Sequence, residues 1–250
     1  MIHPGLHRQP AALDRRLHRE LRVHQPQPDW SFTAGLSALP VVGAEFGDAC
    51  REYPILFVRA PADEQGRAQV LPIAALGLAA GENLYLDGTR WRAQYLPALL
   101  RAYPFGLGRL GDDGRALLTI DLAWSGLSRT EGTPLFDVDG EPGPALRELR
   151  EQLERFEQQR QRTRELCRLL LELQLLRAVR LDATVDGGEP LRVEGFLAVD
   201  EAKLAQLEDA ALLALVRSGV LALLHAHQVS LGNLRKLLQW RLQRDAGAPA

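Results

Sequence analysis

The chain has 250 residues, of which 46% are hydrophobic and 25% charged, a composition typical of a folded protein with a sizeable core. The net charge of −2 gives no reason to expect nucleic acid or an anionic membrane as a partner. The longest apolar runs, such as 71–81, are well short of the roughly 20 residues that cross a bilayer, so no membrane span is expected.

The first 28 residues carry four of the six histidines and little apolar periodicity, which predicts a flexible tail over 1–28. They lack the apolar core of a signal peptide, so the sequence by itself indicates a cytoplasmic protein. His3 and His7 would share a helical face, but an isolated pair does not make a metal site. Cys50 and Cys167 lie among apolar residues and are expected to be buried thiols rather than a disulfide.

Residues 29–142 alternate short apolar runs with turn signals, which predicts an α+β part. The expected strands are 39–43, 54–58, 68–78 and 117–123, and the expected short helices are 44–53 and 95–102. Hairpin turns are expected at Asp87-Gly88 and Asp113-Gly114, because both central residues of a type I′ turn need a positive φ.

One four-residue pattern, Arg-X-Tyr-Pro, occurs at 51–54 and again at 101–104, each time after a short amphipathic segment. Proline disfavours helix in the residue before it, so Tyr53 and Tyr103 are expected to mark helix ends. Arg51 and Arg101 would then lie in the last helical turn, where a cation favours the helix dipole. The pattern predicts a repeated helix-to-strand junction with a buried tyrosine ring, and the alternative is a pocket that both junctions line.

Residues 143–178 are expected to form one long helix that starts near Pro144, because proline suits a first helical turn. Apolar residues recur at spacings of three and four from Leu146 onward. The section 157–165 is polar nearly all round, so it must be exposed or bridge two packed ends.

The last part, 179–244, is expected to be a hairpin plus helices that pack with 29–142 as one domain. Strands 179–185 and 191–199 would flank a turn at Asp186-Gly187, followed by a helix capped by Asp200. More helices would fill 208–244, with a break at Ser218-Gly219. The predicted fold class is α+β: a mainly antiparallel sheet with short helices, one long helix and a helical C-terminal part.

Two sequence patterns invite a metal-binding interpretation. His225 and His227 lie in a helical context, where residues two apart point about 200° from each other, so we expect one buried histidine and no shared metal. The acidic run 137–141 lacks the spacing and terminal Glu of a calcium loop, so a tight turn is expected. No metal or cofactor is predicted, and no nucleophile or phosphate-binding motif is present.

Several separated motifs give the chain a family resemblance. They are PVVGAEF-DACREYPILF (40–57), LGL-AGENLYLD (76–87), W-A-YLPALLRAYPF (91–105), LFD-DGEP (135–142), GF-AVDE-KL (195–204) and HAH-VSLGNLRKL (225–237). In this order they are similar to the SapC family of bacterial proteins. The resemblance implies protein partners in the surface layer, or in envelope uptake beside TonB-dependent receptors. Cell-surface location would then require export without a signal peptide.

Two functions are carried forward. The first is a non-catalytic interaction protein, similar to SapC, whose long helix presents a partner surface. The second is an enzyme of unknown reaction, acting on a peptide or small molecule, with a pocket near the two junctions. Its candidate acid, base or anion-binding residues are Glu45, Arg51, Glu52, Tyr53, Arg101 and Tyr103.

Overall fold

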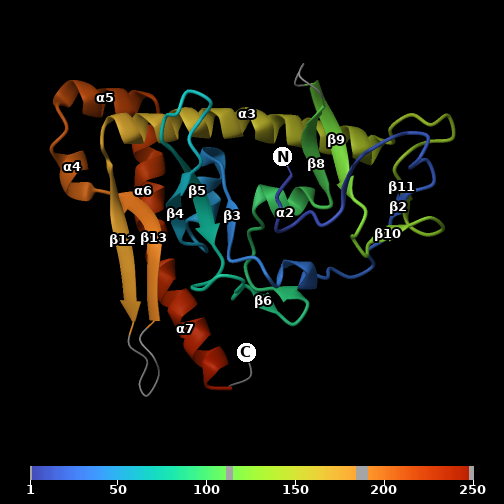
Figure 1. Cartoon of the computed structure of the whole chain (residues 1–250), viewed down its shortest axis with the longest axis horizontal. Helices are drawn as coiled ribbons and strands as arrows, with labels where there is room; N and C mark the ends of the chain where they lie inside the picture. The colour runs from blue at the N-terminus through green and yellow to red at the C-terminus, as the bar shows by residue number, and fades with distance from the viewer. Residues whose placement is uncertain (1, 111–114, 184–190, 248–250) are drawn as a thin grey trace.

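The computed structural model describes residues 2–110, 115–183 and 191–247. Its main element is a five-stranded sheet in the order β12-β13-β4-β5-β3, and every neighbouring pair is antiparallel (Figure 1). Its strands are β3 (Ala38–Pro40), β4 (Ile55–Ala60), β5 (Gln69–Ala75), β12 (Leu176–Ala183) and β13 (Leu191–Val199). The α+β, mainly antiparallel prediction is confirmed.

The other half of the molecule carries smaller antiparallel sheets. One has the order β1-β9-β8 and one has the order β10-β2-β11, while β6 and β7 form a two-stranded ribbon. Their bounds are β1 (Pro10–Ala12), β2 (Arg22–Val23), β6 (Leu86–Asp87), β7 (Arg90–Trp91), β8 (Phe105–Leu110), β9 (Arg115–Asp121), β10 (Leu127–Ser128) and β11 (Thr133–Pro134).

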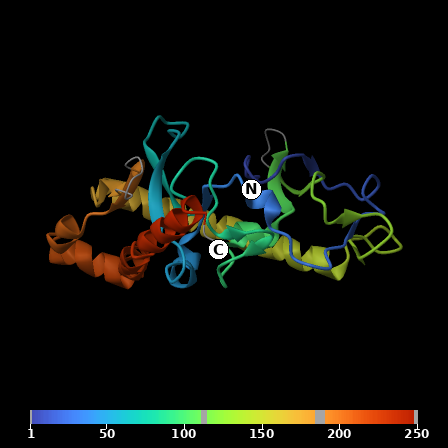
Figure 2. The ribbon, with the colours of Figure 1, turned by 90° about the horizontal axis from the view of Figure 1, so that it is seen from below.

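Short helices surround the sheets, and one long helix spans both halves. The helices are η1 (Ser31–Thr33), η2 (Gly43–Glu45), α1 (Phe46–Ala49), α2 (Ala98–Ala102), α3 (Pro144–Glu172), α4 (Glu201–Ala205), α5 (Asp209–Arg217), α6 (Val220–Ser230) and α7 (Asn233–Asp245). The 29 residues of α3 extend about 43 Å at 1.5 Å per residue. Figure 1 shows α3 along one edge of the molecule, and Figure 2 shows it from below, reaching from one half to the other.

The buried apolar residues form two clusters, and α3 contributes to both. Leu146 and Leu153 near its start belong to the smaller cluster, around Ile120. Leu166 and Leu170 near its end belong to the larger cluster, beneath the five-stranded sheet. The polar middle section therefore bridges two packed ends, as its composition predicted, and polar side chains are tolerated there because much of that surface faces solvent.

The N-terminal segment does not match the predicted tail. Residues 10–12 pair with β9, residues 22–23 pair with β10 and β11, and Leu6 and Leu21 are buried. These two strands could not be predicted because they have only three and two residues, too few for a periodic pattern. Their backbone groups complete small sheets whose other strands lie about a hundred residues away in the sequence.

Most predicted turns and breaks are present. Gly88 has φ 60° between β6 and β7, and Gly219 has φ 75° at the start of α6. The Asp200 carboxylate accepts a hydrogen bond from the Lys203 backbone amide (3.2 Å), as expected of an N-cap. The acidic run folds as a tight turn in which the Asp137 carboxylate accepts from two backbone amides. The predicted turns at 113–114 and 186–187 lie outside the described residues.

A continuous chain of aromatic contacts links the two halves opposite α3. From the α7 side, consecutive ring centroids lie 4.4–6.1 Å apart. The rings in order are Trp240, Tyr85, Trp91, Trp30, Phe32, Tyr103 and Trp124, and Tyr53 stacks on Tyr85. Both tyrosines of the Arg-X-Tyr-Pro pair therefore belong to one aromatic network.

Candidate functional site

The first Arg-X-Tyr-Pro junction leads from α1 into β4. The Tyr53 ring is fully buried, Arg51 is exposed, and β4 begins one residue after Pro54. The Tyr53 hydroxyl donates to the carbonyl of Tyr95 and accepts from the Trp91 indole N–H (2.8 Å). The hydroxyl is thus fully used inside the fold, and burial raises its pKa far above the ordinary value.

Two glutamates beside this junction hold the segment that precedes α2. The Glu52 carboxylate accepts from the backbone amides of Gln94 (2.9 Å) and Tyr95 (2.8 Å). The Glu45 carboxylate, 5% exposed, accepts from the Tyr95 hydroxyl (2.9 Å) and the Ala98 amide (2.7 Å). Burial raises the pKa of Tyr95, and the negative charge of Glu45 raises it further. Both carboxylates therefore hold residues 94–98, the segment that leads into α2 and the second junction.

The C-terminal motif, HAH-VSLGNLRKL, holds the first junction from the other side. The Asn233 amide donates to the carbonyls of Cys50 (2.8 Å) and Tyr53 (3.3 Å). The Lys236 ammonium donates to the Glu52 carbonyl and lies 5.3 Å from the centre of the Tyr85 ring. Burial lowers the pKa of Lys236, and the Glu52 charge partly offsets this. The C-terminal motif thus holds the backbone of the first junction, which lies some 180 residues earlier in the sequence.

His227 joins two strands where they separate. The register of β13 with β4, Phe196 opposite Val58, would place Val199 opposite Ile55. Instead the Val199 N–H donates to Nε2 of His227 (3.0 Å), and Nδ1–H donates to the Ile55 carbonyl (2.8 Å). These partners require the neutral imidazole with its proton on Nδ1. His227 is fully buried and His225 is exposed, which confirms the prediction that only one of the two is buried.

The second junction leads from α2 into β8, with Pro104 buried and Tyr103 half-buried at the C-cap of α2. The Tyr103 hydroxyl donates to the fully buried Asp121 (2.9 Å). Burial alone would raise the pKa of Asp121, but hydrogen bonds, including those from the amides of Arg8 (3.0 Å) and Gln9 (2.7 Å), outweigh it and hold this pKa below the ordinary value. This carboxylate anchors the N-terminal segment.

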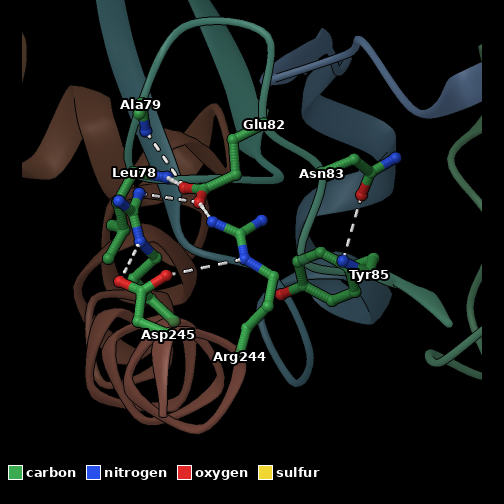
Figure 3. Close-up of polar contacts among 8 residues, drawn as sticks. Leu78, Ala79, Glu82, Asn83, Tyr85, Arg244 and Asp245 are labelled. Atoms are coloured by element: carbon green, nitrogen blue, oxygen red, sulfur yellow. Dashed lines mark hydrogen bonds and ion pairs between the residues drawn. The ribbon is translucent and has the colours of Figure 1, made fainter. Parts of the chain in front are cut away.

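A buried glutamate on the loop after β5 holds the C-terminal helix in place (Figure 3). One oxygen of Glu82 accepts from the backbone amides of Leu78 (2.7 Å) and Ala79 (3.2 Å). The other forms ion pairs with Arg241 (2.8 Å) and Arg244 of α7. Glycine is required at position 77 because a Cβ there would lie 2.2 Å from the Glu82 carbonyl oxygen.

Replacing Glu82 with Gln should lower the free energy of unfolding by about 2 kcal/mol, because it breaks the ion pairs of a buried carboxylate with Arg241 and Arg244. The loss is smaller than for a fully buried pair because both arginines are partly solvated. The matched control is Asp245→Asn, which removes a more exposed carboxylate from the same arginines and should cost about 0.5 kcal/mol or less. Urea unfolding measures both. Equal losses would contradict the assignment of Glu82 as the anchor of α7.

A hollow of about 400 Å³ opens between η2, α2 and α3. Two of the six sequence-predicted site residues, Glu45 and Arg101, line it. The Arg101 guanidinium lies 5.5 Å from the centre of the Tyr95 ring, whose hydroxyl donates to Glu45. Asp48 and Arg155 also line this hollow. It therefore combines a buried carboxylate with charges of both signs at its rim.

The six predicted site residues do not form one cluster. Glu52 and Tyr53 bind backbone and aromatic groups inside the fold, Tyr103 binds Asp121 in the other half, and Arg51 faces solvent. The sequence reasoning missed further polar residues that fix these segments. They are Glu82, Tyr95, Asp121, Asn233 and Lys236. Four of them lie within the motifs quoted above, but nothing in those motifs showed which partner each would find.

Within the described residues, no three His, Cys, Asp or Glu side chains are grouped as a metal site. In the same part of the chain, no single helix is long and apolar enough to span a membrane. Among the described helices, only α5 and the α6–α7 segment, taken together as a pair bent by 86°, reach the length and apolar composition of a span.

Comparison with known proteins gives one match, to the family model described as SapC, over residues 13–237. No curated protein matches the chain, and no solved structure matches it. The matched range contains both Arg-X-Tyr-Pro junctions, the whole of α3 and the C-terminal motif up to Leu237.

Proposed function

Because the chain belongs to the SapC family, we propose that it is a non-catalytic interaction protein that serves the bacterial surface layer or envelope-linked uptake of the TonB-receptor type. The partners we propose are envelope proteins. The family membership supports the bacterial setting, and the surface of α3 supports the interaction role.

The observation that carries this proposal is the shape of the surface along α3, where the exposed helix lies between hollows. One hollow, of about 730 Å³, lies between α3 and the loop joining β4 to β5. A second, of about 470 Å³, lies between α3 and the break that separates α5 from α6. With the hollow beside α2, the helix has a depression on several flanks while its polar side chains face outward. An exposed ridge between grooves offers a partner both shape and charge.

The polar residues of the family motifs support the same conclusion. Tyr53, Glu52, His227 and Asn233 each hydrogen-bond to backbone or side chains within the fold. Their chemistry is used to fix the junctions and to attach the C-terminal helices. A protein whose distinctive polar residues stabilise its own framework suits a role as a rigid binding partner.

The test is affinity purification of the tagged full chain from its bacterial host after cross-linking, with mass spectrometry of the bound proteins. Glu165 lines both large hollows. Glu165→Arg should therefore reduce recovery of envelope proteins by about tenfold or more, because the new positive charge would repel the positively charged groups of a partner that contact Glu165 in the wild type. The control is Glu131→Arg, the same change at an exposed site in the other half, with unchanged recovery. If both variants retain the same envelope proteins, or if none is enriched over an untagged strain, the proposal fails.

A second candidate function is an enzyme, favoured by the presence of Glu45, Tyr95 and Arg101 at one hollow. Incubation of the protein with a metabolite extract of the host, followed by mass spectrometry, would detect turnover. Products that form with the wild type and not with Arg101→Gln would favour the enzyme. A profile unchanged by the wild type argues against it.

A further inference from the structure

The hollow beside α2 has a lining that is unusual in its mixture of groups. Its apolar wall consists of Val42, Ala98, Leu99, Leu153 and Phe156. The charged lining residues come from four elements: Glu45 from η2, Asp48 from α1, Arg101 from α2, and both Arg155 and Glu157 from α3. Of these, Glu157 is already ion-paired with Arg160. A volume of about 400 Å³ lies in the range of small-molecule sites.

Glu45 gives this hollow a negative wall. Its carboxylate is 5% exposed and accepts hydrogen bonds from the Val42 amide (2.9 Å), the Tyr95 hydroxyl and the Ala98 amide. All three donors are neutral, and in the described part of the chain no basic side chain pairs with Glu45. A buried carboxylate is normally compensated by a cation. Asp48, exposed at the same wall, likewise has no ion pair among the described residues.

The opposite charge comes from two arginines. Arg101 lies against the Tyr95 ring, so its guanidinium and the Glu45 carboxylate approach the same phenol. Arg155 extends from the exposed side of α3. Neither arginine forms an ion pair with any residue that the structure describes. Guanidinium groups are well suited to bind a carboxylate through paired N–H donors.

We propose that this hollow binds a small zwitterion with an apolar side chain, namely a hydrophobic amino acid or a dipeptide with both ends free. The ammonium group lies toward Glu45 and Asp48, the carboxylate toward Arg101 and Arg155, and the side chain against Leu99, Leu153 and Phe156. The inference goes beyond the proposed function, because it requires neither a partner protein nor turnover of the ligand.

Isothermal titration calorimetry of the full chain with Leu-Leu and with free leucine is the first test. At least one of the two should bind with a dissociation constant of about 1 mM or tighter. N-acetylation of that ligand, or amidation of its carboxyl end, should each weaken binding about tenfold or more, because each removes one charge. No binding by either free ligand up to about 10 mM overturns the proposal, and so does equal binding of the blocked forms.

Variants at the rim locate the site. Arg155→Gln and Asp48→Asn alter exposed side chains, so the fold should persist, and each should weaken binding of the free ligand about tenfold. The control, Arg162→Gln, changes an arginine on the same helix at a different hollow and should bind as the wild type does. In addition, Arg155→Gln should have little effect on the amidated ligand, which has no carboxylate. Equal binding by all three variants would exclude this hollow, whatever the outcome of the purification experiment.

Discussion

Replacing Tyr53 with Ala should lower the free energy of unfolding by about 3–5 kcal/mol, the range for deleting a fully buried aromatic side chain. The ring stacks on Tyr85 with centroids 4.5 Å apart, so its removal opens a cavity at one end of the aromatic network. It also leaves the Trp91 indole N–H and the Tyr95 carbonyl without the hydroxyl they bind. Denaturant unfolding followed by tryptophan fluorescence measures this loss.

The hydroxyl groups of Tyr53 and Tyr103 should contribute different amounts to the free energy of unfolding. Tyr53→Phe should cost about 1–3 kcal/mol because it leaves two groups unpaired in the interior. Tyr103→Phe should cost about 1 kcal/mol, since Tyr103 is half-buried and Asp121 keeps its backbone donors. If Tyr53→Phe instead keeps full stability and loses partner binding in the purification assay, the junction is a binding site rather than a structural device.

Lowering the pH from 7 to 4 should remove about 3 kcal/mol of stability through His227 alone. Burial lowers the pKa of this imidazole to about 4, against about 6.5 in the unfolded chain. The unfolded state therefore binds a proton first as the pH falls. The His227 contribution is complete above about pH 7, decreases through 6.5 and is lost near pH 4. Protonation would also place two facing N–H groups between Nε2 and Val199.

The comparison with His227→Gln isolates this contribution. The glutamine amide has an NH2 group that donates and an oxygen that accepts, but it does not titrate, so the variant should lose about 3 kcal/mol less stability than the wild type between pH 7 and pH 4. His3 and His7 also have pKa values lowered by burial, and they act equally in both proteins. The Asp121 contribution is lost only below about pH 4, because its pKa is held below the ordinary value. Parallel pH curves for wild type and variant would contradict the role of His227.

The sequence by itself determined the local elements. Spacing of apolar residues located α3 and most strands of the main sheet, and glycine located the turn between β6 and β7 and the break before α6, because these signals act within a few residues. The Arg-X-Tyr-Pro pair indicated two helix-to-strand junctions, and the second has the expected form, with Arg101 in the last turn of α2 and Tyr103 at its C-cap. At the first junction the helix is shorter than predicted: α1 ends at Ala49, so Arg51 and Tyr53 lie in the turn that leads to β4. The helical context around 225–227 correctly indicated that only one histidine would be buried.

Only the tertiary structure decided what the polar residues do. Glu45 and Glu52 read equally well as catalytic acids until Tyr95 and its neighbouring amides are seen to bind them. Strands of two or three residues at the N-terminus have no detectable period, yet their backbone pairs with segments about a hundred residues away. His227 bridges two strands only because β13 separates from β4 at that point. Hydrogen-bond partners of this kind are distant in the chain, so no local pattern encodes them.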